Sequence, residues 1–335
     1  MTSLIVVHPK FDGVWPFAAD ALHTRWLSEG PAAFLRLATD ETRSLGDVVD
    51  APAQVTRMVV LGVPVTERCV EKFAALEEVA CQQAYSDEAG DLFRARGVTV
   101  YRHNSEGFWG ESVSEYALAL TLCGLRRIPQ LHHQILSDLS PWDYAPADGV
   151  GLAGQRGQQY GDDSRFTNGT VAGKRIRIVG AGNIGSRYAS FVKMLGADVA
   201  AWDPFAAEPA FHRAGSRREF HLDRLVQDAE IFVPMVPLTD STRGLVTAEH
   251  IRALPTGCLV VLATRANICD MPTLRERVLA DELALAGDVF DVEPLPLDDP
   301  LLGRGNVVHS PHNAGRTVHA NERWAGALAD QFRPR

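Results

Sequence analysis

Residues 174–203, K-R-I-R-I-V-G-A-G-N-I-G-S-R-Y-A-S-F-V-K-M-L-G-A-D-V-A-A-W-D, decide the fold of this chain. The apolar, β-branched run at 176–179 is typical of a short buried strand. Apolar residues then recur at helical intervals from 184 to 195, and a second apolar run at 198–202 predicts another strand. The stretch is therefore predicted to fold as strand, turn, helix and strand.

Three glycines occupy the predicted turn with the spacing G-x-G-x-x-G: Gly180, Gly182 and Gly185. In such a turn the first glycine allows the bend, the second lets the backbone approach a pyrophosphate, and the third lets helix pack on strand. The amide groups of Asn183 and Ile184 would meet the anion at the positive end of the helix. A turn without a ligand is the simpler alternative, but the whole strand, glycine, helix and strand pattern favours a dinucleotide site.

Asp203 ends the second predicted strand, 18 residues after Gly185. A carboxylate at this place accepts hydrogen bonds from the adenosine ribose and repels a 2′-phosphate. Pro204 and Phe205 follow it and supply no arginine to offset that charge. The sequence therefore predicts NAD rather than NADP.

The chain has 335 residues, of which 46% are hydrophobic and 22% charged, an ordinary globular composition with enough length for two domains. Its formal net charge of -9 argues against nucleic acid or an anionic membrane as a partner. No apolar run approaches the roughly 18 residues of a membrane span, and the N-terminal residues lack the basic segment of a signal peptide. We expect a soluble, cytoplasmic protein.

The cysteines show neither metal-ligand spacing nor a disulfide pattern. The five are Cys69, Cys81, Cys123, Cys258 and Cys269. Most lie in apolar runs, so buried free thiols in a reducing compartment are expected. No metal site is predicted.

The first part of the chain alternates short apolar strands with helical patterns. Strands are predicted at 4–7, 58–61, 77–81 and 98–101, with helices such as 18–27 and 66–76 between them. Such alternation indicates a parallel sheet with helices on both faces. The strongly apolar segment 112–126 predicts the helix that leads into a second domain.

After the glycine turn, further strands are predicted at 230–236, 258–264, 284–290 and 306–310, with helices at 222–227, 248–254 and 273–282. Together with the two strands of the opening stretch they make a six-stranded, doubly wound parallel sheet, which binds ligands at the carboxyl ends of its strands. A last helix at 319–332 is expected to return to the first domain. The predicted fold class is α/β, with a nucleotide domain and a smaller α/β domain.

Residues 143–169 lack periodicity and contain six glycines. A mobile spacer is the favoured interpretation of such a loop, and a functional loop is the alternative. The aromatic residues Trp142, Tyr144 and Tyr160 are more than a spacer requires.

Three ionisable residues follow predicted strands of the second domain: Arg265, Glu293 and His312. Their positions place them near the cofactor crevice. Arg265 closes the apolar run V-V-L-A-T-R and needs an anion or an open cleft, although a salt bridge at the rim would also satisfy it. His312 can pair with Glu293 at the adjacent strand end, and the alternative is a purely structural histidine.

Beside a nicotinamide, these three residues suffice for hydride transfer at a carbonyl. Arg265 would hold a substrate carboxylate in a fork and polarise the carbonyl oxygen. His312 would exchange a proton with that oxygen, a role worth about 10²–10⁴-fold in rate, while Glu293 keeps it charged and aimed. The cofactor carries the hydride.

Further motifs make the chain resemble the D-isomer-specific 2-hydroxyacid dehydrogenase family, closely from about residue 98 to 317. Besides the glycine turn they are V-P-L-T-D-S-T-R-G-L-V at 236–246, A-T-R at 263–265, G-D-V-F-D-V-E-P-L-P at 287–296 and S-P-H-N-A-G at 310–315. The resemblance implies an NAD-dependent dehydrogenase with Arg265, Glu293 and His312 as its catalytic residues.

The same resemblance implies further cofactor contacts: Asp288 at the nicotinamide carboxamide, and the backbone at Val236, Pro237, Ala263, Thr264 and Gly315. It implies a flavodoxin-like substrate domain made of residues 1–108 with 313–335. A Rossmann-type NAD domain would then span 109–312 and carry the long loop at 143–169. It also implies a homodimer.

The chain departs from the family's pattern at Met235, Leu262 and Ala266, without losing a catalytic group. C-Q-Q-A-Y-S-D at 81–87 replaces the family's A-G-x-G-x-D loop, so Gln82 and Gln83 are the expected substrate contacts. Glutamine amides donate to anionic oxygens, which leaves a carboxylate or a phosphonate open as the substrate's anion. Whether Trp142 reaches a neighbouring subunit is also left open.

The leading hypothesis is an NAD-dependent oxidoreductase that interconverts a D-2-hydroxy acid and a 2-oxo acid, or a phosphonate analogue of such an acid. Its small anionic substrate would be its partner, with no role for nucleic acid or a membrane. The alternative from another class is a catalytically weak NAD(H)-sensing binding protein, as in corepressors that resemble this family. The acidic charge favours the enzyme.

Overall fold

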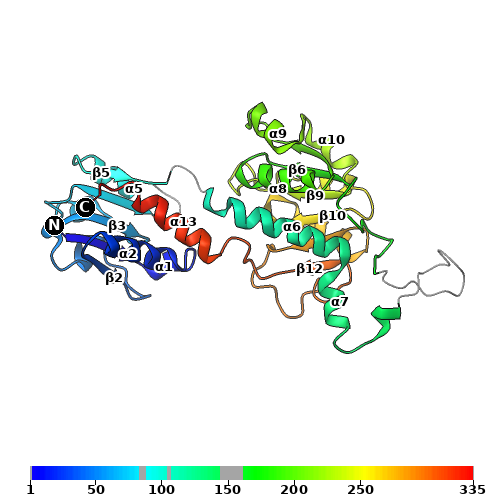
Figure 1. Cartoon of the computed structure of the whole chain (residues 1–335), viewed down its shortest axis with the longest axis horizontal. Helices are drawn as coiled ribbons and strands as arrows, with labels where there is room; N and C mark the ends of the chain where they lie inside the picture. The colour runs from blue at the N-terminus through cyan, green and yellow to red at the C-terminus, as the bar shows by residue number, and fades with distance from the viewer. Residues whose placement is uncertain (1, 83–87, 104–106, 144–160, 335) are drawn as a thin grey trace, which may run out of the picture. The chain divides into compact units, whose positions relative to one another are not determined.

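The computed structural model describes residues 2–82, 88–103, 107–143 and 161–334 (Figure 1). The chain divides into two compact units. The first comprises Met1–Trp109 and Arg316–Arg335, and the second comprises Gly110–Gly315. The chain therefore passes between the units at Trp109–Gly110 and again at Gly315–Arg316.

The first unit contains a five-stranded parallel sheet in the order β2-β1-β3-β4-β5. This is the flavodoxin-like order. Its strands are β1 (Thr2–Val7), β2 (Ala32–Arg36), β3 (Val55–Leu61), β4 (Glu78–Gln82) and β5 (Thr99–Tyr101). The edge strand β2 is not predicted from the sequence, because it is nowhere fully buried and therefore has no long apolar run.

The helices of this unit are α1 (Pro9–Asp12), α2 (Ala18–Glu29), α3 (Leu45–Val48), α4 (Glu67–Val70), α5 (Glu88–Arg94) and α13 (Val318–Ala329). The helix expected at 66–76 ends at Val70. Turns follow it, and these turns bring Phe73 and Leu76 into the core although neither is helical.

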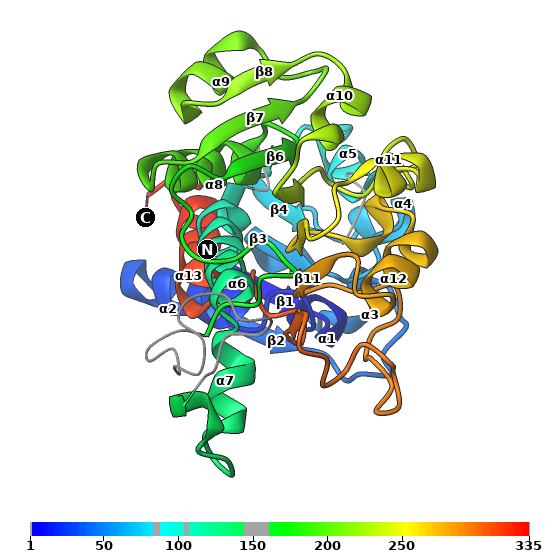
Figure 2. The same ribbon diagram turned by 90° about the vertical axis from the view of Figure 1, so that its right-hand side faces the viewer.

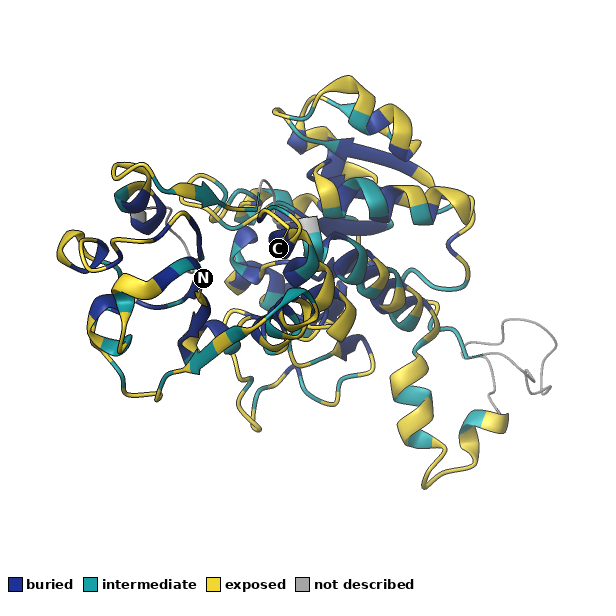
Figure 3. Cartoon of the chain, turned by 60° about the vertical axis from the view of Figure 1, so that its left-hand side comes forward, coloured by how far each residue is buried: buried dark blue, intermediate teal, exposed yellow. Residues whose placement is uncertain are grey.

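Two cores lie on the two faces of the first sheet. Ile5 and Val7 of β1 join one core with α2 and α13, whereas Leu4 and Val6 join the other with α4 and α5. Successive side chains of a strand point to opposite faces, which explains the division. The inner strands β1, β3 and β4 are mostly buried, and the helices around them are partly exposed (Figure 3).

The C-terminal helix α13 returns to the first unit, as the sequence predicts. Trp324 of α13 packs with Phe11 and Trp15 at ring-centroid distances of 5.3 and 5.6 Å. Trp15 in turn stacks on Trp109 at 3.9 Å. This aromatic cluster anchors the chain one residue before it enters the second unit.

The second unit contains a seven-stranded parallel sheet in the order β12-β11-β10-β9-β6-β7-β8. Its strands are β6 (Arg175–Val179), β7 (Asp198–Trp202), β8 (Arg217–Glu219), β9 (Ile231–Pro234), β10 (Leu259–Leu262), β11 (Ala284–Gly287) and β12 (Val307–His309). The order is that of a doubly wound nucleotide-binding sheet with one strand added beyond the sixth. The prediction of six strands is wrong because it lacks the edge strand β8. The sequence of this strand, R-R-E, contains no apolar residue.

Two long helices cover one face of this sheet: α6 (Gly110–Arg126) and α8 (Asn183–Met194). The opposite face carries α10 (Leu222–Gln227), α11 (Ala248–Ala253) and α12 (Met271–Leu279) (Figure 2). The remaining helices are α7 (Ile128–Gln134) and α9 (Glu208–Ala214). None of the helices among the described residues is long and apolar enough to cross a membrane.

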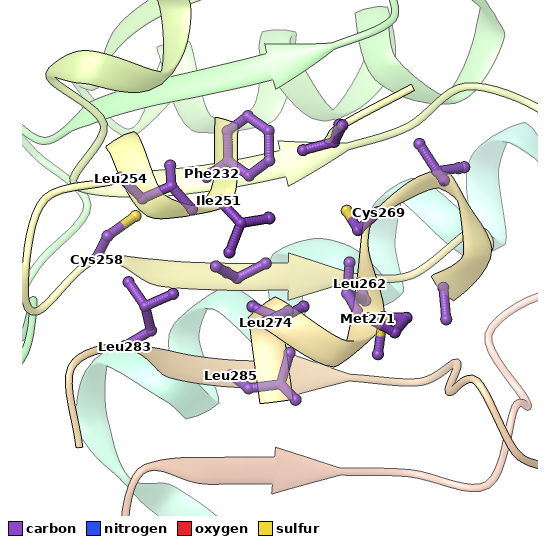
Figure 4. Close-up of a cluster of buried hydrophobic side chains, with 14 of the residues drawn as sticks. Phe232, Ile251, Leu254, Cys258, Leu262, Cys269, Met271, Leu274, Leu283 and Leu285 are labelled. Carbon is purple, nitrogen blue, oxygen red and sulfur yellow. The ribbon is translucent and has the colours of Figure 1, made fainter. Parts of the chain in front are cut away.

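A large apolar cluster packs α11 and α12 against the sheet (Figure 4). Leu274 of α12, Ile251 of α11 and Phe232 of β9 are completely buried in it. Truncating such a leucine to alanine typically costs about 2–5 kcal/mol. Two free cysteines, Cys258 and Cys269, belong to the same cluster, and burial raises the pKa of the Cys269 thiol to about 12.

A buried arginine closes the amino-terminal end of the second sheet. Arg177 of β6 is 2% exposed and donates to Asp228 at 2.6 Å and to Asp198 at 3.1 Å. The two carboxylates remain about half exposed. The Arg177 guanidinium lowers the pKa of Asp228 through its hydrogen bonds.

This asymmetry of burial yields a prediction for stability. Asp198→Asn combined with Asp228→Asn leaves a buried guanidinium without a counter-charge and should lower the free energy of unfolding by about 3 kcal/mol. Arg177→Met leaves only carboxylates that water can reach, so it should cost about 1 kcal/mol. Urea unfolding of both variants measures the difference, and an equal or reversed order would contradict this account.

Candidate active site

The three glycines of the dinucleotide turn each meet a different steric requirement. Gly180 follows β6 with φ +104°, and a Cβ there would lie 2.9 Å from Val236 Cγ1. A Cβ on Gly185 would lie 2.2 Å from the carbonyl oxygen of Gly180. A Cβ on Gly182, by contrast, would have nothing within 4 Å. A side chain at the first or third glycine would therefore clash within the turn. The second glycine leaves open space beside the backbone.

That open space lies at the N-terminus of α8. Gly182 is the N-cap residue of this helix and has no side chain to cap it. Asn183 and Ile184, the first helical residues, present their backbone at this end, where the helix dipole favours an anion. The open space beside Gly182, which a side chain at this position would occupy, fits the pyrophosphate of a dinucleotide.

Asp203 is the residue after β7, and its carboxylate is already engaged. Oδ2 accepts from Ala181 N at 2.8 Å, and Oδ1 accepts from Phe205 N and Ala206 N at 2.9 and 3.0 Å. A carboxylate offers about four acceptor positions, so capacity for a ribose hydroxyl remains. Asp203 thus also ties the glycine turn to the next strand.

The expected backbone contacts cluster at the carboxyl edge of the same sheet. Val236 and Pro237 follow β9, while Ala263 and Thr264 follow β10. Thr264 Oγ1 donates to the carbonyl of Pro234 at 3.2 Å and so joins the two strand ends. Gly315 is the last residue of the second unit.

Glu293 and His312 are in direct contact. Glu293 Oε2 lies 2.6 Å from His312 Nδ1, and Glu293 Oε1 accepts from Phe290 N at 2.8 Å. Both side chains are about one third exposed. The pair is therefore partly open to solvent, and the backbone of Phe290 holds the Glu293 carboxylate.

The loop that carries His312 is held by Asp288. This residue follows β11 directly and is completely buried. It accepts from Ser310 Oγ at 2.7 Å, from Asn313 N at 3.1 Å and from Ala314 N at 2.9 Å. His312 lies between these donors with φ +52°, a left-handed conformation that non-glycine residues rarely adopt. The family resemblance implies a cofactor contact for Asp288, and no sequence pattern indicates these hydrogen bonds to the loop.

Arg265 stands apart from this pair. It is exposed, and its Nη1 donates to the carbonyl of Thr264 at 2.7 Å. Among the hydrogen bonds and ion pairs of the described residues, none joins Arg265 to Glu293 or His312. The structure thus brings together two of the three residues expected to be catalytic.

The substrate residues expected in the first unit are only partly described. Gln82 ends β4, and its carbonyl accepts from Gly62 N at 2.9 Å. Gln83 lies outside the described residues, as does most of the segment 143–169. Trp142 is 68% exposed. Among the described residues, no cluster of His, Cys, Asp and Glu side chains could hold a metal ion.

A doubly wound sheet, a glycine turn with an open second glycine and an acid after the next strand define the second unit as a dinucleotide-binding domain. Residues 151–314 match the family model "D-isomer specific 2-hydroxyacid dehydrogenase, NAD binding domain". The second unit therefore carries the NAD-binding domain of the D-isomer-specific 2-hydroxyacid dehydrogenase family, and its cofactor is NAD.

Curated relatives agree with this assignment. D-3-phosphoglycerate dehydrogenase of Archaeoglobus fulgidus is 30% identical over 226 residues, 67% of this chain and 38% of the relative. Glyoxylate reductase of Korarchaeum cryptofilum is 27% identical over 255 residues, 76% of this chain and 71% of the relative. The chain thus spans well under half of the first relative's length.

The fold is also that of a solved structure. D-2-hydroxyisocaproate dehydrogenase superposes with a TM-score of 0.71 at 18% identity, covering 98% of this chain and 94% of that one. At this identity the likeness concerns the fold, which has the two-domain α/β architecture that the sequence predicts.

The glycine turn makes a testable prediction. Gly182→Ala places a methyl group in open space, so its stability should stay within about 0.5 kcal/mol of the parent, while NADH affinity falls about tenfold or more because the pyrophosphate needs that space. Gly185→Ala, which collides with the Gly180 carbonyl, should instead destabilise the fold. Urea unfolding and NADH titration separate the two effects, and normal NADH binding by Gly182→Ala would contradict the proposed pyrophosphate site.

Proposed function

We propose that the chain is an NAD-dependent oxidoreductase that interconverts a D-2-hydroxy acid and the corresponding 2-oxo acid. The hydrogen bond between Glu293 and His312, at the carboxyl edge of the NAD-binding sheet, is the observation that carries the proposal. Beside a nicotinamide, such a pair can donate a proton to a carbonyl oxygen and accept it back. The names of the relatives support the same reaction class.

The proposed mechanism begins with the state of His312. When Nδ1 donates to Glu293 Oε2, the carboxylate fixes the orientation of the imidazole, and Nε2 is left to face the substrate. Bound NADH would supply a hydride to the carbonyl carbon of the substrate. His312 donates a proton from Nε2 to the carbonyl oxygen, and in the reverse direction it takes that proton back.

Arg265 is proposed to bind the substrate's carboxylate. In the structure its guanidinium donates to its own chain at Thr264, and it is exposed. A guanidinium has five N–H donors, so it can grip a carboxylate in a bidentate fork without losing that contact. A local cation is needed because the chain as a whole carries a net charge of -9.

The first unit, Met1–Trp109 with Arg316–Arg335, is proposed to be the substrate domain. Gln82 lies at the carboxyl edge of its sheet, where an amide can donate to an anionic oxygen. The amide N–H groups can donate to the oxygens of either a carboxylate or a phosphonate, so a phosphonate analogue of a 2-oxo acid is the second candidate substrate. We further infer a cytoplasmic location, which the five free cysteines support.

A substrate panel tests the reaction class. NADH oxidation is measured with glyoxylate, hydroxypyruvate, pyruvate, bulkier 2-oxo acids and phosphonopyruvate. Turnover of one of these acids is the expected result, and the preferred acid identifies the substrate class. Tight NADH binding without turnover of any acid would instead favour an NAD(H)-sensing binding protein.

His312→Ala should lower kcat by about 10²–10⁴-fold and leave NADH affinity close to that of the parent, because His312 acts on the substrate's proton. Arg265→Ala should raise KM for the 2-oxo acid and lower kcat together. Steady-state kinetics and NADH titration measure both variants. Near-normal turnover of His312→Ala across the pH range would exclude it as the proton donor.

We also propose a homodimer, formed through an exposed apolar arm at residues 128–142. The arm and the end of α6 expose large apolar side chains that monomeric proteins rarely gather in one place. They are Leu122, Ile128, Ile135, Leu136, Leu139 and Trp142. The arm carries one acidic residue, Asp138, and no Lys or Arg, which is typical of the core of an interface between identical chains.

Leu136→Lys combined with Leu139→Lys should convert the dimer to a monomer, because two charges would enter the proposed interface. Light scattering coupled to size exclusion at micromolar protein measures the mass. Met194→Lys is the matched control, since this residue is 79% exposed on α8 and lies outside the arm. A parent protein that is already monomeric would contradict the proposal, as would a double variant that stays dimeric.

A further inference from the structure

The segment that carries Glu293 is closed by an arginine that the proposed mechanism does not use. Arg275 of α12 donates from Nη1 to Asp291 Oδ1 at 3.1 Å and from Nη2 to Asp299 Oδ2 at 2.5 Å. Asp291 and Asp299 lie on either side of Glu293 in the chain. One guanidinium thus joins the two ends of the segment 291–299.

The contacts of this clamp are largely shielded from water. The Arg275 side chain is 19% exposed, and those of Asp299 and Asp291 are 7% and 28% exposed. Burial alone would raise the pKa of Asp299, but the N–H of Leu301 and the Arg275 guanidinium outweigh it and lower the pKa. The Asp299 carboxylate is therefore charged at neutral pH, and a shielded fork of this kind is screened only weakly by salt.

A short path leads from the clamp to the acid–base pair. Asp291 is the residue after Phe290, whose N–H donates to Glu293 Oε1 and whose ring is buried in the core. The other oxygen of Glu293 contacts His312. Without Arg275, the Asp291 and Asp299 carboxylates would repel each other with no cation between them, and the segment holding Glu293 would shift.

We propose that Arg275 is a positioning residue, which closes the segment 291–299 so that the Glu293 carboxylate meets His312. Among the described residues, the side-chain hydrogen bonds of Arg275 go to Asp291 and Asp299 and none goes to the glycine turn, so Arg275 acts through these two carboxylates. Its effect on turnover rests on the function proposed above. The geometry that it controls is a property of the protein without substrate or cofactor.

The first test therefore uses the protein alone. A 2.6 Å hydrogen bond from an imidazole N–H to a carboxylate should give a low-field proton resonance, assigned by its loss in His312→Gln. Arg275→Met should remove or broaden this resonance, and Arg275→Lys should weaken it less, because an ammonium keeps the charge but not the fork. A resonance unchanged in Arg275→Met would overturn the proposal.

Arg175→Met is the matched control. Arg175 also bridges two carboxylates, Asp228 and Glu230, but it lies at the amino-terminal end of the second sheet. The low-field resonance should survive in this variant. If Arg275→Met fails to fold, the comparison of Arg275→Lys with Arg175→Met decides the question in the same way.

The second test is kinetic. Arg275→Met should lower kcat about tenfold, since misplacing a catalytic group by a fraction of an ångström has effects of this order, while NADH affinity stays unchanged. Adding Asp291→Asn should recover part of the loss by removing the repulsion. Full turnover in Arg275→Met would overturn the proposal. An inactive parent would instead overturn the proposed function, and the resonance would still decide the clamp.

Discussion

One completely buried carboxylate, that of Asp288, connects the NAD-binding sheet to the proposed acid–base pair. A charge without water is tolerable only when donors surround it, and here the donors are Ser310 Oγ, Asn313 N and Ala314 N. All three belong to the loop that carries His312. The carboxylate therefore dictates the loop's backbone, including the left-handed conformation of His312, and the imidazole is presented to Glu293 as a consequence.

The other side of the pair is constrained in a different way. Glu293 lies on a segment whose ends are drawn together by Arg275, and its own carboxylate is held by the Phe290 amide. Hydrogen bonds to the buried Asp288 thus position His312, whereas the shielded ion pairs of Arg275 position Glu293. Arg275 is neutralised by two carboxylates of its own chain, whereas Arg265, which we propose to bind the substrate's carboxylate, is exposed.

Much of this molecule is predictable from local patterns. The glycine turn, the strand before it and the acid after the next strand are encoded within thirty consecutive residues, 174–203, because backbone sterics and helix periodicity act over short distances. The edge strands β2 and β8 escape prediction, since neither contains a fully buried residue and neither therefore needs an apolar run. Helix α4 is shorter than its pattern predicts because Phe73 and Leu76 reach the core from turns.

The sequence by itself determines the fold class, the nucleotide turn and the identity of the candidate catalytic residues, because each is written in residue types at short spacing. Only the tertiary structure decides which of these residues meet. The contacts of Asp288 with the loop at 310–314 and of Arg275 with Asp291 and Asp299 join residues 16 to 26 positions apart. These pairings depend on the register of the parallel strands and on the need of a buried charge for hydrogen-bond or ion-pair partners. A local sequence pattern contains neither kind of information.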